Sequence, residues 1–108
     1  LTKSLMDLKN APTAIICSLD KFFIGCLQEC KNRNLIVGKN ISVVGYNDHD
    51  SYLSSQNLTF ISHPLLSMGQ ESVQILKNIE RGEKPNEQIK LIEPILHEGK
   101  SDGHLKKT

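Results

Sequence analysis

Two short apolar runs dominate the hydrophobic pattern of the chain. They are "TAIIC" at positions 13–17 and "ISVVG" at positions 41–45, and neither alternates between polar and apolar residues. A strand of this kind is expected where both faces of a sheet are covered, as in parallel sheets. The pattern therefore predicts two buried strands, each covered on both faces.

The segment between these runs has the pattern of an amphipathic helix. Ser18 or Asp20 is expected to cap its first turn. Its apolar and small residues fall on one stripe at helical spacing: Phe23, Cys26, Leu27 and Cys30. A strand, a helix and a strand within about thirty residues form a βαβ unit, which is right-handed and parallel in nearly every known case.

The rest of the chain adds three further elements and a tail. An opening helix should stop before Pro12, and "LTFIS" (58–62) reads as a short strand. The clearest helix runs from Pro64 to a stop at Gly82. One side of it carries apolar residues, namely Leu65, Met68, Val73, Leu76 and Ile79. We expect "IKLIEPILHE" (89–98) to form one strand, or two that Pro94 separates, before a flexible tail.

Polar residues follow the second strand directly, as Tyr46, Asn47 and Asp48. In an open parallel sheet, ligands bind just beyond the carboxyl ends of the strands. Asn and Asp also shape turns by bonding their own backbone, so a purely structural turn remains an open alternative.

Composition narrows the classes of function. Thirteen Lys and Arg residues against twelve Asp and Glu give a net charge of +1, so these residues should not bind nucleic acid by themselves. No apolar run could span a bilayer or form the core of a signal peptide, so we expect a cytoplasmic protein without membrane contact. The three cysteines, Cys17, Cys26 and Cys30, are expected to be reduced.

Motifs of catalysis and cofactor binding are missing from the sequence. There is no phosphate-binding glycine loop, nucleophile elbow or paired-cysteine zinc pattern, so we expect neither an enzyme nor a cofactor. His49, which lies between Asp48 and Asp50, could bind a metal, but a solvated polar loop is the better interpretation, and we expect no metal site.

Taken in order, these motifs resemble the C-terminal part of the lactose-repressor/galactose-repressor family of transcription regulators. The resemblance covers about residues 1–101 and rests on "PTAI", a turn ending in Asp20, "SVVGYN", an "LT" segment before "HPLLSMG", and a closing strand. It implies an α/β fold of the periplasmic-binding-protein-like I type. The parallel sheet flanked by helices would be a C-terminal fragment of a two-lobed core.

The resemblance also implies a division of the chain. Residues 1–57 would belong to the C-terminal lobe and 58–63 would cross between lobes. The helix at 64–82 would pack on the N-terminal lobe, 83–98 would return as a strand to the C-terminal lobe, and 99–108 would be a flexible tail.

Family positions for effector binding fall on this sequence as follows. The residue after the second strand, which bonds effector hydroxyls in relatives, corresponds to Asn47. The Asn of the family's Asn-Asp turn corresponds to Leu19, which can neither donate nor accept a hydrogen bond. The Asp of that turn is kept as Asp20, whose expected role is to cap the helix.

The resemblance implies a homodimer as well. Relatives dimerise through the helix after that turn and the loop after the second strand, which places six residues at the interface: Phe22, Ile24, Leu27, Gln28, Tyr52 and Leu53. From the pattern alone, Phe22 and Ile24 could equally belong to a wide core face.

The sequence thus predicts the effector-binding and dimerisation portion of a transcriptional repressor. A sugar or sugar derivative would be its effector, and operator DNA would be bound only through a headpiece absent from this chain. Two alternatives remain open: a sugar-binding protein of a transport system, and an association-only module that has lost effector binding because of Leu19.

Overall fold

The computed structural model describes residues 1–47, 56–84 and 89–104, which form two compact units. One unit contains Leu1–Ser62 and the stretch from Leu96 onward, and the other is His63–Ile95. The elements follow the order α1 (Thr2–Met6), β1 (Ala14–Cys17), α2 (Asp20–Asn32), β2 (Ser42–Asn47), β3 (Phe60–Ser62), α4 (Leu65–Glu80) and β4 (Ile95–His97).

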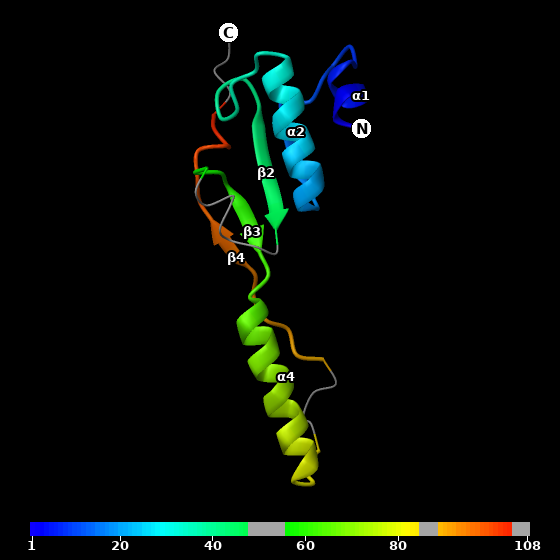
Figure 1. Ribbon diagram of the computed structural model, residues 1–108, viewed down its shortest axis with the longest axis vertical. Helices are drawn as coiled ribbons and strands as arrows, with labels where there is room; N and C mark the ends of the chain where they lie inside the picture. The colour runs from blue at the N-terminus through cyan, green and yellow to red at the C-terminus, as the bar shows by residue number, and fades with distance from the viewer. Residues whose placement is uncertain (48–55, 85–88, 105–108) are drawn as a thin grey trace. The chain divides into compact units, whose positions relative to one another are not determined.

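The strands form one sheet in the order β1-β2-β3-β4. β1 and β2 are parallel, with Ala14 opposite Ser42 and Cys17 opposite Gly45, and β2 and β3 are parallel with Asn47 opposite Ser62. The parallel βαβ unit predicted from the sequence is therefore confirmed, and α2 lies alongside β2 in Figure 1.

Helix α2 covers one face of this sheet and builds the core with it. Phe23, Cys26 and Cys30 on its predicted stripe are buried, and Leu27 is half-buried against them. The sheet contributes Cys17, Val43 and Phe60 to the core, and Ile41, directly before β2, completes it. Burying a large apolar side chain contributes about 1.5–3 kcal/mol, so this cluster is the main stabilising feature of the first unit.

Gly45 makes the close contact between helix and sheet possible. A Cβ placed on Gly45 would lie 2.5 Å from Cε1 and 2.8 Å from Cγ of Phe23, whose side chain is fully buried. Only a residue without a side chain lets the Phe23 ring rest directly on the backbone of β2. The Gly of the "SVVG" motif therefore serves the packing of α2.

The opposite face of the sheet is less covered than the sequence predicts. Ile16 is 78% exposed and Ala14 is exposed, while Val44 and Tyr46 are only half-buried. The expectation that both strands are covered on both faces is therefore wrong for this chain. An apolar strand indicates that both faces of the sheet can be covered by protein. It does not indicate which residues cover the second face.

Residues 99–104 pack against β2 and β3, contrary to the flexible tail expected from 99 onward. Ser101 is 1% exposed; its hydroxyl donates to the Val43 carbonyl oxygen (2.6 Å) and accepts the Thr59 N–H (2.8 Å). Thr59 donates from its hydroxyl to Asp102 and accepts the Gly99 N–H (3.0 Å). This stretch is thus part of the first unit, whereas the end of the predicted tail, 105–108, lies outside the described residues.

The second unit consists mainly of α4, which ends as the sequence predicts. Gly82 follows the helix with φ +79°, its N–H donates to the Ile79 carbonyl (2.9 Å), and the Glu83 N–H donates to the Asn78 carbonyl (3.0 Å). This pair of bonds is a Schellman motif, for which glycine is favoured because of its positive φ. The predicted apolar side of α4 is exposed, with Val73 51% and Leu76 64% accessible.

The three cysteines are free thiols inside the core of the first unit. Burial raises the pKa of Cys30 to about 11. The hydrogen bond with Cys17, together with burial, raises the pKa of Cys26 well above its usual value. Cys26 and Cys30 therefore stay protonated at neutral pH, where a thiol is a poor nucleophile and a poor metal ligand.

Candidate functional site

The carboxyl ends of β1, β2 and β3 meet at one edge of the sheet, which is where the sequence predicts a ligand site. The register aligns Cys17, Gly45 and Phe60 in one row, all of them buried. Two positions further toward the edge, beyond the pair Tyr46 and Ile61, Asn47 lies opposite Ser62. Asn47 is thus the last residue of β2 and lies at the predicted edge.

Leu19 begins helix α2 after β1 and remains 54% exposed. It occupies the N-cap position with extended backbone (φ −139°, ψ 147°), and its carbonyl accepts the Phe23 N–H at 3.0 Å. The cap expected from Ser18 or Asp20 is therefore wrong, since no side chain caps this helix. The carbonyl bond needs only the backbone, so it does not require a polar side chain at this position, and the Leu19 side chain presents apolar surface near the sheet edge.

Asp20 is the first residue of α2, one position inside the cap. Its carboxylate accepts the Lys21 N–H at 2.7 Å, and the side chain is exposed. An anion in the first turn interacts favourably with the helix dipole. Asp20 therefore acts on the helix terminus, although as a first-turn residue rather than as the cap.

A polar pair next to Asn47 was missed by sequence reasoning. The hydroxyl of Ser62 lies 2.8 Å from Nε2 of His97, and the His97 ring stacks on Phe60 with centroids 4.3 Å apart and 8° between the planes. The two bonded residues are 35 positions apart in the sequence. No local pattern signals such a contact; only the neighbouring places of β3 and β4 bring it about.

Of the predicted dimer residues, three are exposed on α2. Phe22 is 51% and Ile24 50% accessible, and Gln28 is exposed and donates to Asn32 (3.0 Å). Leu27 instead packs partly against the core. Tyr52 and Leu53 lie outside the described residues, as do Asp48, His49 and Asp50 of the loop weighed as a metal site.

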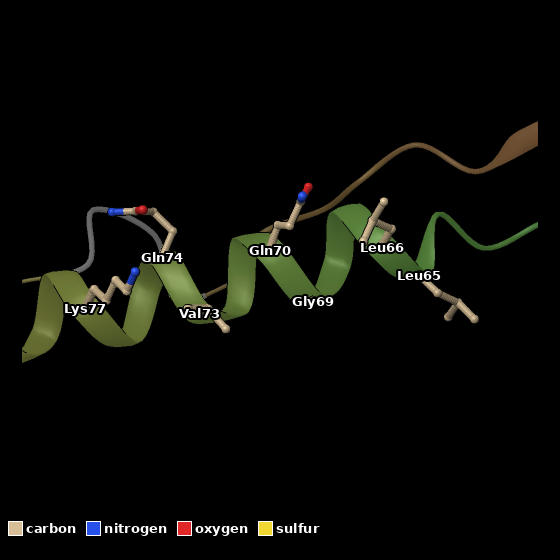
Figure 2. Close-up of a pocket in the computed structure, with 7 residues that line it drawn as sticks. All are labelled: Leu65, Leu66, Gly69, Gln70, Val73, Gln74 and Lys77. Carbon is tan, nitrogen blue, oxygen red and sulfur yellow. The ribbon is translucent and has the colours of Figure 1, made fainter.

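A second surface feature lies in the other unit, along α4. Seven residues line a shallow groove on this helix: Leu65, Leu66, Gly69, Gln70, Val73, Gln74 and Lys77. Figure 2 shows Leu65 and Val73 on one side of the helix and Gln70 and Gln74 on the other. The groove combines apolar and amide groups and has no cluster of titratable groups, so it resembles a packing surface more than a site of chemistry.

Neither unit offers a metal centre or a membrane segment in the parts that the structure describes. Across residues 1–47, 56–84 and 89–104, no three His, Cys, Asp or Glu side chains are grouped so as to hold a metal ion. No helix in these ranges has the length and apolar character to cross a bilayer.

Comparison with known proteins identifies the family to which the chain is similar. Residues 1–101 match the family model described as a periplasmic binding protein-like domain. The HTH-type transcriptional repressor PurR of Glaesserella parasuis is 34% identical over 86 residues, which are 79% of this chain and 25% of that protein. The ribose operon repressor of Haemophilus influenzae is 30% identical over 92 residues, which are 83% of this chain and 27% of that protein.

The fold is also found in solved structures. The dimeric Lac repressor with an 11-residue C-terminal deletion superposes with a TM-score of 0.83 at 28% sequence identity, covering 97% of this chain and 39% of that one. The chain spans about a quarter of the length of the curated relatives it matches. The likeness therefore concerns one portion of a larger architecture.

Proposed function

Since this chain belongs to the periplasmic binding protein-like domain family and corresponds to the C-terminal portion of lactose-repressor/galactose-repressor regulators, we propose that it binds a small effector and dimerises within a transcriptional repressor. The observation that carries the proposal is the parallel β1-β2-β3 register, which brings Leu19, Asn47 and Ser62 to one sheet edge. Ligands of open parallel sheets bind at this edge.

The uncovered surfaces of both units support a larger assembly. Ile16 on the sheet and Leu66 and Leu76 on α4 are each more than half exposed. Apolar surface of this extent is usually covered by further protein. In the proposed whole protein, the N-terminal lobe covers α4, the segment at 58–63 crosses between the lobes and 83–98 returns as a strand.

The proposed mechanism is a shift of population between two arrangements of the lobes. An effector that binds one arrangement more tightly favours it by the difference in binding free energy. In a dimer, that shift changes how two headpieces are presented to an operator, which couples the effector site to DNA binding. This chain would supply one wall of the effector site and part of the dimer surface.

Asn47 is expected to be the residue on which effector binding depends most. Titrating the full-length regulator with D-ribose, L-arabinose, D-galactose and D-glucose should reveal a sugar that raises Tm, by about 5–10 °C at roughly 100 times Kd. Ribose is included because of the named ribose operon relative. Asn47→Ala should reduce this shift to about half at the same sugar concentration, because the variant loses the amide expected to bond a sugar hydroxyl.

The matched control for this experiment is Asn32→Ala, at the far end of α2. It makes the same chemical change away from the sheet edge, so the sugar should still raise its Tm as in the wild type. If no sugar raises the Tm of the wild type, the association-only module becomes the better function, as the apolar Leu19 already suggests. An undiminished shift in Asn47→Ala would contradict the role of Asn47.

The dimer surface is proposed to include the exposed side of α2. Ile24→Glu should raise the dimer dissociation constant of the full-length regulator at least about a hundredfold, because a carboxylate would be buried without a partner. Sedimentation velocity across a dilution series measures the change. Ile36→Glu is the control, since Ile36 is exposed to a similar extent (55% against 50%) but lies in the turn before β2. Equal dissociation constants for the two variants would exclude Ile24 from the interface.

The repressor names of the relatives favour this function over a transport protein. Buried free thiols agree with that preference, because exported proteins are usually oxidised.

A further inference from the structure

The His97 imidazole is fixed in place next to the proposed effector edge. One of its faces stacks on Phe60, which is fully buried, and its Nε2 lies 2.8 Å from the Ser62 hydroxyl. Ser62 is itself only 1% exposed, so the hydroxyl is held by its surroundings. These two contacts from β3 help to orient the ring, which is half-buried.

The position of this pair in the sheet register connects it to Asn47. Ser62 is the direct neighbour of Asn47, and β4 is the direct neighbour of β3. Three adjacent strands thus each contribute one polar residue at the carboxyl end of β2 and β3: Asn47, Ser62 and His97. Two positions back along the strands, the row of Cys17, Gly45 and Phe60 is buried. The sheet therefore changes from apolar to polar over two positions.

The fold alone gives little reason for this change. A Ser–His pair taken out of water must form a hydrogen bond to offset the loss of hydration, whereas an apolar pair of similar volume would pack on Phe60 without that requirement. Small-molecule sites typically contain a few polar groups held in fixed orientation among apolar side chains, where they determine ligand orientation and specificity.

We propose that His97 is a specificity-determining residue of the effector site, where its imidazole hydrogen-bonds a hydroxyl group of a sugar-like effector on the β4 side of Asn47. Leu19 lies at the opposite, β1 end of the same edge and is 54% exposed. The side chains along the edge therefore change from apolar at β1 to polar at β3 and β4. Such a site fits a ligand with hydroxyl groups toward β3 and β4 and an apolar or deoxy group toward β1. The inference rests on the proposed effector-binding function.

The test uses the full-length regulator and isothermal titration calorimetry with D-ribose, L-arabinose, D-galactose and its 6-deoxy form, D-fucose. The double variant Ser62→Ala/His97→Phe removes both polar partners together and keeps an aromatic ring for Phe60 to stack on, so stability should change little. We expect its affinity for a sugar that binds the wild type to fall about tenfold, the effect of losing one good hydrogen bond. The single variant Ser62→Ala keeps the imidazole and should weaken binding less.

The possible outcomes distinguish a failure of the proposed His97 role from a failure of the proposed effector binding. If the double variant binds within twofold of the wild type while Asn47→Ala binds about tenfold more weakly, the effector site stands and His97 has only a structural role. Urea unfolding of the same variants shows whether a loss of affinity is merely a loss of folded protein. If none of the four sugars binds the wild type, the proposed function fails and this inference fails with it.

Discussion

Replacing Gly45 by Ala should lower the free energy of unfolding of the protein by about 2–3 kcal/mol, which is a large effect for the addition of one methyl group. The new Cβ would come within 2.8 Å of Cγ of Phe23 and closer still to other ring atoms. Phe23 has no exposed surface and packs among Cys26 and Cys30, so its ring has no free space to enter. Either α2 moves away from the sheet or the ring leaves its rotamer, and both cost free energy.

Gly25→Ala is a matched control for Gly45→Ala, because both glycines lie in the same unit. Gly25 lies inside α2, and a Cβ placed there meets nothing within 4 Å. Gly25→Ala should therefore stabilise the protein by about 0.5–1 kcal/mol through helix propensity. Urea denaturation followed by circular dichroism measures both variants. Similar stabilities for the two would mean that α2 does not rest on the backbone of β2.

The Gly45 contact also affects the proposed site, because Gly45 is two residues before Asn47 on the same strand. A displaced Phe23 would change the path of β2 where it reaches the sheet edge. We therefore expect any sugar binding to weaken in Gly45→Ala more than its loss of stability would explain.

Periodicity was sufficient to predict the central βαβ unit. The stripe of Phe23, Cys26 and Cys30 is buried as expected, and Gly82 ends α4 with the backbone geometry that glycine favours. These features depend on residues within one or two helical turns of each other, so the local sequence is enough to predict them. The parallel pairing followed from the short connection through a helix.

Contacts between distant residues account for what the sequence did not reveal. The segment "GKSDG" is polar and rich in glycine, so it reads as an exposed tail, yet Ser101 is buried by bonds to Val43 and Thr59, which are 58 and 42 positions away. His97 gave no local signal either, because its partners Ser62 and Phe60 belong to another strand. In the same way, the pattern of β1 indicated two covered faces but could not show that the described chain covers only one of them well.

Ser101→Ala should lower the free energy of unfolding by about 2–3 kcal/mol, because it removes the bonding partner of two groups at once. The Ser101 hydroxyl accepts the Thr59 N–H at 2.8 Å and donates to the Val43 carbonyl at 2.6 Å, in a position that is 1% exposed. Alanine leaves both main-chain groups without that partner in a place that water does not reach, and each buried unsatisfied group costs about 1–3 kcal/mol. The backbone bond from the Val43 N–H to the Ser101 carbonyl (2.8 Å) does not involve the side chain and should persist, so the segment should stay in place.

Ser4→Ala is the matched control for this variant, since Ser4 is exposed on α1 in the same unit and alanine favours helix. Its free energy of unfolding should remain within about 0.5 kcal/mol of the wild type. Amide hydrogen exchange adds a local measurement: in Ser101→Ala the Thr59 amide should exchange faster, because its acceptor is lost, by more than the change in global stability explains. Ser101→Ala could instead prove as stable as Ser4→Ala, with the Thr59 amide keeping its protection from exchange. Residues 99–104 would then not stabilise the packing of β2 and β3, and the flexible tail expected from the sequence would be the correct description.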